Sequence, residues 1–418
     1  MPVIDEPAGA RCFQAMVAMR DGTRLNTFVF LPESGGPRWP VILHRTPYGI
    51  TASEARDKTD CTKAWLPNPA EPLRGSILRG WRNIVAHGYA AVYQDTRGRH
   101  GSEGEDRVYA DDAADGYDTL EWIAGQPWSN HMVGMSGSSA GATTTFAAAS
   151  TRHPTLRAFF AQAGASSIYD DVVYEGQSIE MERLWLWVAR NIPGLSQSHR
   201  EAVMRRFGIA AAELDAAAAS ATERYLRLDA ARCTDPPFVA SADWMRLPLT
   251  HYPDFATWQP FLDEIIAHPT PDAFRAQHNF RRTIEIPGFH VTTWFDIFQT
   301  SVLAAFNDIH ARVGNQLLWI GPNEHYFVYQ SNFWRACRPA SWTGRRCFIR
   351  HAPGSPTARG MSPATGNTRS AGRRRASGRA GFTCAVTAPS RPRGRAARHA
   401  AIITIRAARS RPWAGATG

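Results

Sequence analysis

The chain has 418 residues, of which 44% are hydrophobic and 20% charged, and its formal net charge is +10. These proportions exclude bulk disorder, collagen and coiled coils, and at roughly 100–200 residues per domain the length predicts two or three domains. Because no apolar run approaches ~18 residues and the first residues lack a signal-peptide pattern, we expect neither a membrane span nor a secretory leader. The six cysteines show no metal-ligand spacing, which favours a cytoplasmic protein with free thiols and no metal.

The first part of the chain alternates strand patterns with helix patterns. Apolar and polar residues alternate on both sides of Asp21-Gly22, which is typical of a β-hairpin. Apolar runs followed by polar loops, and segments with helical periodicity, continue the pattern. We predict strands at 39–45, 88–95, 131–136 and 157–164, and helices at 110–126 and 142–150. Such alternation predicts an α/β fold with a mostly parallel sheet covered on both faces.

The pattern changes near residue 168. From there to about residue 284 the sequence is helical and rich in bulky aromatic residues, which predicts an inserted helical cap over 168–284. Strand patterns return at 286–296 and 316–325, separated by a helical segment. We therefore expect a core made of two parts, residues 1–167 and 285–330.

The last segment, residues 331–418, has a different composition. It contains 18 Arg and no Lys, Asp or Glu, so the rest of the chain carries a formal charge of about −8. Few apolar residues are available to offset the entropy of ordering. Three interpretations of this segment are open: a disordered basic tail, an arm that binds nucleic acid, or a segment read from a shifted frame of a GC-rich gene. We favour the shifted frame and expect no nucleic-acid partner.

A candidate nucleophile lies in the sequence Gly137-Ser138-Ser139-Ala140-Gly141, a G-x-S-x-G motif. The motif follows an apolar strand and opens a helix of small residues, which is the setting of a nucleophile elbow. Ser139 lies at its centre, whereas Ser136 and Ser138 lack the flanking pattern and are interpreted as turn-supporting hydroxyls. The alternative interpretation is an ordinary glycine-rich turn.

A serine nucleophile needs a base that is oriented by an acid, and in α/β-hydrolases the chain order is Ser, acid, His. Asp296 ends one predicted strand and His325 follows the next, so both lie where parallel strands place their active sites. We predict these two residues as the acid and the base. The rival candidates are His278 in the cap, His290 within its strand, Asp308 and His310 on a helix, and Glu324 beside the predicted base.

The oxyanion formed during acyl transfer needs two preorganised donors. The backbone N–H of Ala140, directly after the predicted nucleophile, is expected to be one of them. The loop from Arg45 to Gly49 places Tyr48 after a predicted strand, and its hydroxyl is a candidate for the other. The alternative role for Tyr48 is that of a loop anchor.

Several motifs in matching order resemble one family. The motifs that carry the resemblance are RDGTRLNTFVFLPE, HRTPYG, QDTRGRHGSEGE, GYDTLEWIAGQPWSNHMVGMSGSSAG, WFD and GPNEH. The chain is similar to the Xaa-Pro dipeptidyl-peptidase and cocaine-esterase-like (CocE/NonD) hydrolases over about residues 12–330. The resemblance implies an α/β-hydrolase core, a helical cap and a C-terminal jelly-roll domain. It implies Ser139 as nucleophile, Asp296 as acid, His325 as base and Tyr48 as oxyanion donor.

The same resemblance includes the loop with Asp95, Arg97, Ser102 and Gly104, which we interpret as structural hydrogen-bonding residues. The sequence also departs from the family in two ways. Ala140 stands where the family often has Tyr, although its backbone N–H remains. The residues after His325 lack the alternating strands of a jelly roll, so that domain is expected to be missing.

The main functional prediction is a serine hydrolase of the esterase or acylase type, which acts on a small-molecule ester, an amide or a short peptide through an acyl-enzyme, without a cofactor or membrane partner. The first alternative is a dipeptidyl-peptidase, which needs an acidic site for the substrate ammonium group. Asp170, Asp171 and Glu175 are the candidates for it, with a solvated loop as the favoured interpretation. The remaining alternatives are a truncated, inactive product and a basic-tailed binding protein. The oligomeric state is not indicated.

Overall fold

The computed structural model describes residues 10–50, 81–175, 178–231 and 260–325. The Arg-rich segment 331–418, and with it the expected absence of a jelly-roll domain, lies outside the described residues. Within the described part of the chain, no helix is long and apolar enough to cross a membrane.

An eight-stranded sheet forms the core, in the order β1-β2-β4-β3-β5-β6-β9-β10. The strands are β1 (Ala10–Ala18), β2 (Arg24–Pro32), β3 (Trp39–Thr46), β4 (Ala90–Asp95), β5 (Ser129–Ser138), β6 (Leu156–Gln162), β9 (Gly288–Phe295) and β10 (Gln316–Glu324). The β1–β2 and β2–β4 pairs are antiparallel and the remaining neighbours are parallel. The predicted mostly parallel sheet is therefore confirmed.

The predicted hairpin forms from β1 and β2. Ala18 pairs with Arg24 at its closed end, and Gly22 in the turn has φ of +84°. Asp21 Oδ1 accepts the backbone N–H of Thr23 at 3.0 Å, which closes the turn locally.

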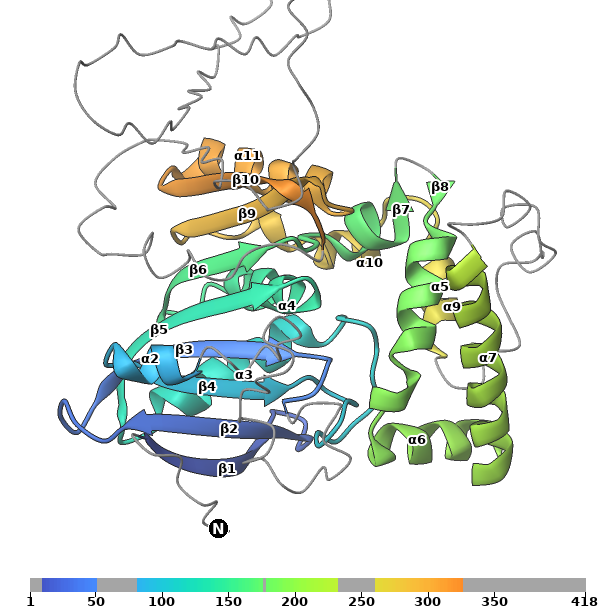
Figure 1. Cartoon of the computed structure of the whole chain (residues 1–418), viewed down its shortest axis with the longest axis horizontal. Helices are drawn as coiled ribbons and strands as arrows, with labels where there is room; N and C mark the ends of the chain where they lie inside the picture. Colours follow the sequence, from blue (N-terminus) through green and yellow to red (C-terminus); the bar gives the residue numbers. More distant parts are fainter. Residues whose placement is uncertain (1–9, 51–80, 176–177, 232–259, 326–418) are drawn as a thin grey trace, which may run out of the picture.

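Helices cover both faces of the sheet (Figure 1). They are α2 (Trp81–Ala86), α3 (Asp112–Ala124), α4 (Ala140–Ser150) and α11 (Gln299–Val313). Because alternate residues of a strand point to opposite faces, Val29 packs in the cluster that contains Leu120 of α3 and Phe146 of α4. Its neighbour Phe30 stacks on Trp81 of α2, with ring centroids 4.6 Å apart, on the other face.

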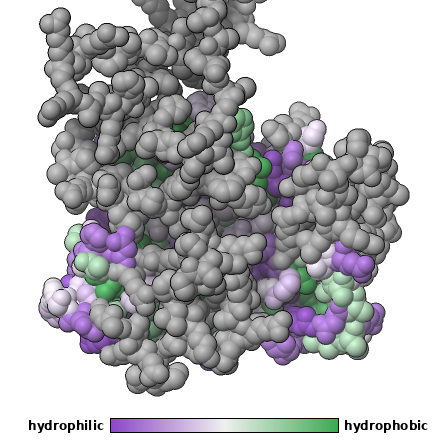
Figure 2. Space-filling model, viewed as in Figure 1, coloured by the Kyte–Doolittle hydropathy of each residue, from purple (hydrophilic) through white to green (hydrophobic). Residues whose placement is uncertain are grey.

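A group of helices lies beyond the end of the sheet toward which the β3 arrow points (Figure 1). They are α5 (Met181–Arg190), α6 (Gln197–Phe207) and α7 (Ala211–Ala231), with the shorter α9 (Phe261–Ile266) and α10 (Ala273–Gln277) nearby. The surface over α6 and α7 mixes hydrophilic and weakly hydrophobic residues, in keeping with the alanine-rich sequence of α7 (Figure 2). The cap boundaries at 168 and 284 remain a prediction.

The stretch directly after residue 168 differs from the helical prediction. It forms a π-helix, Tyr169–Val173, followed by the short antiparallel pair β7 (Tyr174–Glu175) and β8 (Ser178–Ile179). The π-turn carries an acidic pair whose members bond to distant segments, as described below. Those tertiary contacts override the local helical pattern.

Candidate active site

Ser139 lies in a strained turn between β5 and α4. Its φ and ψ angles are +54° and −123°, which a non-glycine residue adopts only when the surrounding structure enforces it. A Cβ atom on Gly137 would lie 1.9 Å from the carbonyl oxygen of Gly141, so the close strand–helix approach requires glycine there. The strand–turn–helix setting expected for a nucleophile elbow is therefore present.

The structure brings the three predicted catalytic side chains together. Ser139 Oγ lies 3.0 Å from Nε2 of His325, and Nδ1 of His325 lies 2.9 Å from Oδ1 of Asp296. The carboxylate acceptor fixes the proton of the ring on Nδ1, which leaves the Nε2 lone pair facing the serine hydroxyl. The arrangement can therefore take a proton from Ser139.

Local contacts hold the predicted acid and the predicted base in place. The side chain of Asp296 is fully buried and that of His325 is 11% exposed, so water does not compete strongly for this pair. Asp296 Oδ1 also accepts the backbone N–H of Phe298 at 2.8 Å, and Oδ2 accepts the hydroxyl of Thr292 at 3.2 Å. The ring of Phe298 packs edge-on against the imidazole of His325, with centroids 5.7 Å apart.

The rival acids and bases lie elsewhere. His290 is fully buried and bonds to Gln316 at 3.0 Å, as expected for a core histidine. Burial lowers its pKa to about 4. Asp308 and His310 lie exposed on α11, and His278 bonds to the carbonyl of Phe274. The side chain of Glu324 is outside the described residues.

The loop that carries Tyr48 ends at the same edge of the sheet as the elbow. β3 ends at Thr46 and its parallel neighbour β5 ends at Ser138, so Tyr48 and Ser139 both follow these ends. Thr46 Oγ1 accepts the N–H of Tyr48 at 3.1 Å, and Gly49 adopts φ of +89° against the ring of His100. Ala140 is the first residue of α4, so its N–H has no acceptor within the helix.

A buried ion pair lies at the end of β3, directly before the loop that carries Tyr48. Arg45 is fully buried, and its Nη1 lies 2.9 Å from Oδ1 of Asp112 on α3. The guanidinium also donates to Gln94 at 2.7 Å. The hydroxyl of Thr144 on α4 donates to the carbonyl of Arg45 at 3.1 Å. One residue of β3 thus anchors both helices that pack behind the elbow.

The loop after β4 makes the structural hydrogen bonds that the sequence suggested. Asp95 accepts the N–H of Ile50 at 2.9 Å and a side-chain bond from Asn26 at 2.8 Å, while Ser102 donates to its carbonyl. Burial raises the pKa of Asp95 to about 7. Arg97 bonds to Asp115, Asp21 and Thr23, and the φ of Gly104 is +87°.

Of the acidic pair at 170–171, only Asp171 differs from the favoured interpretation as a solvated loop. The side chain of Asp171 is 6% exposed, and its Oδ2 lies 3.1 Å from Nη1 of Arg281. The same oxygen accepts the hydroxyl of Ser301 at 2.5 Å. Asp170 lies 3.4 Å from Nη2 of Arg275. Arg281 therefore already neutralises the buried carboxylate of Asp171, whereas Asp170 stays 43% exposed beside Arg275.

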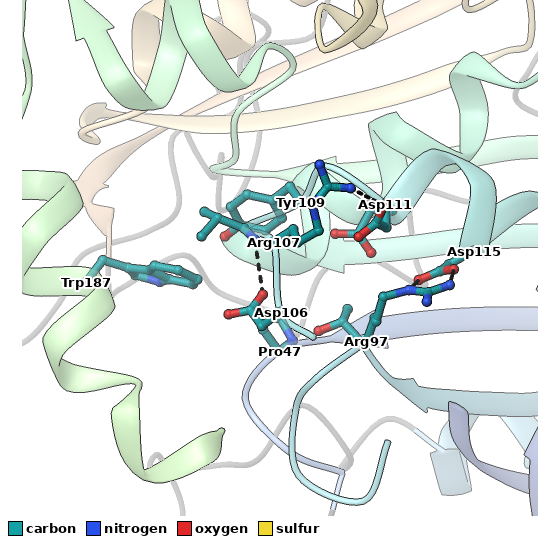
Figure 3. A pocket seen from close by; sticks show the side chains of 11 residues that line it. Pro47, Arg97, Asp106, Arg107, Tyr109, Asp111, Asp115 and Trp187 are labelled. Carbon is teal, nitrogen blue, oxygen red and sulfur yellow. Dashed lines mark hydrogen bonds and ion pairs between the residues drawn. The ribbon is translucent and has the colours of Figure 1, made fainter. Parts of the chain in front are cut away.

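The described ranges offer no metal cluster, and the cavity beside the Tyr48 loop is too small for a substrate. No group of three His, Cys, Asp or Glu within them is placed to hold a metal ion. A cavity of about 20 Å³ lies behind the Tyr48 loop, between Pro47, Tyr109 and Trp187 (Figure 3). Because one water needs roughly 10–15 Å³, this space suits about one water and no substrate.

Comparisons with known proteins match most of the described part of the chain. The family profile described as X-Pro dipeptidyl-peptidase (S15 family) matches residues 21–327. The cocaine esterase of Rhodococcus sp. (strain MB1 Bresler) is 31% identical over 315 residues, which cover 74% of this chain and 48% of that protein. The chain thus spans about half the length of this curated relative.

Two solved structures share the fold. A CocE/NonD family hydrolase from Staphylococcus aureus superposes with a TM-score of 0.54 at 18% identity, covering 82% of this chain and 53% of that one. An α-amino acid ester hydrolase superposes with a TM-score of 0.50 at 21% identity, covering 78% and 50%. The predicted α/β-hydrolase core is therefore confirmed.

Proposed function

Since the chain belongs to the X-Pro dipeptidyl-peptidase (S15) family, we propose that it is a serine hydrolase that cleaves an ester or an amide of a small molecule through an acyl-enzyme on Ser139. The observation that carries the proposal is the hydrogen-bonded series from Ser139 through His325 to Asp296. The strained backbone at Ser139 supports it independently, because such strain concentrates at functional sites.

In the proposed reaction, Ser139 Oγ attacks the carbonyl carbon of the substrate while its proton moves to Nε2 of His325. The negative charge on the carbonyl oxygen is stabilised by the N–H of Ala140 and the hydroxyl of Tyr48. The tetrahedral intermediate collapses, and the leaving group takes the proton from His325. A water molecule then gives a proton to Nε2 of His325 while its oxygen attacks the acyl carbon. The bond from that carbon to Ser139 Oγ breaks, Oγ takes the proton back from His325, and the acid product leaves.

The contacts of Asp171 favour the esterase or acylase type over the dipeptidyl-peptidase alternative. A peptidase that recognises a free amino terminus needs a carboxylate available for the ammonium group. The oxygens of Asp171 are already engaged by Arg281, Ser166 and Ser301. Recruiting this carboxylate to a substrate would break its ion pair with Arg281 and its hydrogen bonds to Ser166 and Ser301. These interactions would have to be replaced, which is costly for a carboxylate that is only 6% exposed.

The test combines covalent labelling with two substrates. We expect a fluorophosphonate to label Ser139, and Ser139→Ala to abolish labelling and to lower the turnover of p-nitrophenyl acetate by about 10⁶-fold. The matched control is Ser138→Ala, one residue earlier, which should keep activity. Faster turnover of Gly-Pro-p-nitroanilide would favour the peptidase, and a soluble chain without labelling would favour an inactive product.

A further inference from the structure

A tryptophan on α5 bonds directly to the hydroxyl of Tyr48. The indole N–H of Trp187 donates to Tyr48 Oη at 3.1 Å, across 139 residues of sequence. The two rings meet edge-on, with centroids 6.5 Å apart. Within the described ranges, this is the hydrogen bond that the Tyr48 hydroxyl makes.

This bond has only one possible polarity. A phenol hydroxyl can both donate and accept, whereas an indole N–H can only donate. Trp187 therefore occupies an acceptor position of Tyr48 and cannot take its proton. The Tyr48 proton stays available for another acceptor, and accepting a bond from the indole polarises the O–H and strengthens it as a donor.

The indole packs against two further side chains. The ring of Tyr109 lies 5.6 Å from that of Trp187, at an interplanar angle of 31°. The guanidinium of Arg99 lies 5.6 Å from the centroid of the indole ring. Figure 3 shows Trp187 projecting from its helix toward Tyr109, with Asp106 close by.

The cation that faces the indole is anchored as well. Arg99 is 1% exposed and pairs with Asp106 at 2.5 Å. Its Nη1 donates to the carbonyl of Asn191, one turn after Trp187, at 2.7 Å. The loop after β4 therefore fixes the end of α5, and with it the direction of the indole N–H.

We propose that Trp187 is a positioning residue that aims the Tyr48 proton at the developing oxyanion, which makes α5 a structural part of the oxyanion hole. The inference rests on the proposed role of Tyr48 as oxyanion donor. It assigns the indole a role through hydrogen bonding, distinct from any contact with the substrate. Its signature is a loss in kcat that depends on the presence of the Tyr48 hydroxyl.

The experiment is a double-mutant cycle on the full chain with p-nitrophenyl acetate. Tyr48→Phe alone should lower kcat by about 10²–10³-fold, the value of one oxyanion donor. Trp187→Phe alone should lower kcat by roughly 5- to 30-fold with KM within about twofold, because the hydroxyl remains but is no longer aimed. In the Tyr48→Phe background, Trp187→Phe should cost less than about twofold more.

Two further variants separate the hydrogen bond from packing. Trp187 replaced by the isostere β-(3-benzothienyl)alanine, whose sulfur cannot donate, should lower kcat as Trp187→Phe does. Trp122→Phe is the matched control, because Trp122 lies on α3, where it packs against Trp128 away from Tyr48. This variant should keep full activity.

The outcomes are distinguishable. Equal losses for Trp187→Phe with and without the Tyr48 hydroxyl would overturn the inference, as would a change confined to KM or an isostere with full activity. If Tyr48→Phe is silent while Ser139→Ala is inactive, the oxyanion assignment and this inference fail but the hydrolase proposal stands. If Ser139→Ala retains activity, the proposed function itself fails.

Discussion

Replacing Asp296 with Asn tests how the acid orients the base. Oδ1 of Asp296 accepts two donors, the N–H of Phe298 at 2.8 Å and Nδ1–H of His325 at 2.9 Å, whereas Oδ2 faces the hydroxyl of Thr292 at 3.2 Å. An amide nitrogen at the Oδ1 position would face two other donors. The introduced amide should therefore keep its oxygen at that position and turn its NH₂ group toward Thr292, whose hydroxyl can rotate to accept.

In that orientation His325 keeps its tautomer and loses only the charge of its partner. A hydrogen bond to a charged group is worth roughly 1.5–3 kcal/mol and a neutral one about 0.5–1.5 kcal/mol. The imidazolium that forms in the transition state should therefore lose about 1–2 kcal/mol of stabilisation, or roughly 5- to 30-fold in kcat. The rate of p-nitrophenyl acetate hydrolysis at saturating substrate measures this loss.

Asp296→Ala is the comparison, because it leaves the donors of Phe298 and His325 without an acceptor and should cost clearly more. A loss near 10⁴-fold for Asp296→Asn, the size found where the amide forces the wrong tautomer, would refute the reasoning. That result would place the amide nitrogen against His325 despite the N–H of Phe298. An unchanged rate would instead show that Asp296 does not act as the acid that orients His325.

Gly137→Ala should prevent the elbow from forming, because the added Cβ would lie 1.9 Å from a backbone oxygen. The control Gly134→Ala, in the same strand, places its Cβ 3.1 Å from a side-chain methyl and should fold. Circular dichroism and fluorophosphonate labelling compare the two variants. Arg45→Met should lower the free energy of unfolding by about 3–5 kcal/mol, because it leaves a buried carboxylate unpaired. Arg152→Met, which breaks an exposed pair, should cost about 1 kcal/mol or less in the same urea titration, and equal losses would contradict the burial argument. Burial holds the pKa of His290 at about 4 against 6.5 when unfolded, so the unfolded chain binds more protons between these values and acid weakens the fold. As the pH falls from 6.5 to 4, the free energy of unfolding of His290→Leu should rise relative to that of the parent by about 1.4 kcal/mol per pH unit. If the difference between the two free energies did not change with pH, the ring would not be buried in its neutral form.

The sequence was sufficient to predict the sheet and the meeting of Ser139, Asp296 and His325, because both follow from regular rules. Period-two alternation and apolar runs predicted the strands, and the carboxyl ends of parallel strands meet at one edge. Ser139 and Asp296 directly follow strand ends, and His325 follows β10, so that rule alone brings them to the same edge. The distances between these three side chains depend on the order of the strands in the sheet. That order cannot be predicted from any local sequence pattern.

The features that the sequence did not predict all depend on partners from distant segments. Asp171 was interpreted as part of a solvated loop, but its partners Arg281 and Ser301 come from a helical segment and from α11. Trp187 lies in a run of bulky aromatic residues, in which nothing distinguishes a core ring from one that bonds to Tyr48. Side-chain pairing across more than a hundred residues leaves no periodic signal.

Arg45 stabilises both the strained turn at Ser139 and the loop that carries Tyr48. Arg45 fixes α3 through its side chain, receives the hydroxyl of Thr144 on α4 at its carbonyl, and leads within three residues to Tyr48. A strained φ at Ser139 persists only when packing over-determines it, and α4 supplies that packing. A change at Arg45 that lowers stability should therefore lower kcat at temperatures where the chain is still folded. Since the guanidinium is buried, it cannot touch substrate, and KM should change less than kcat.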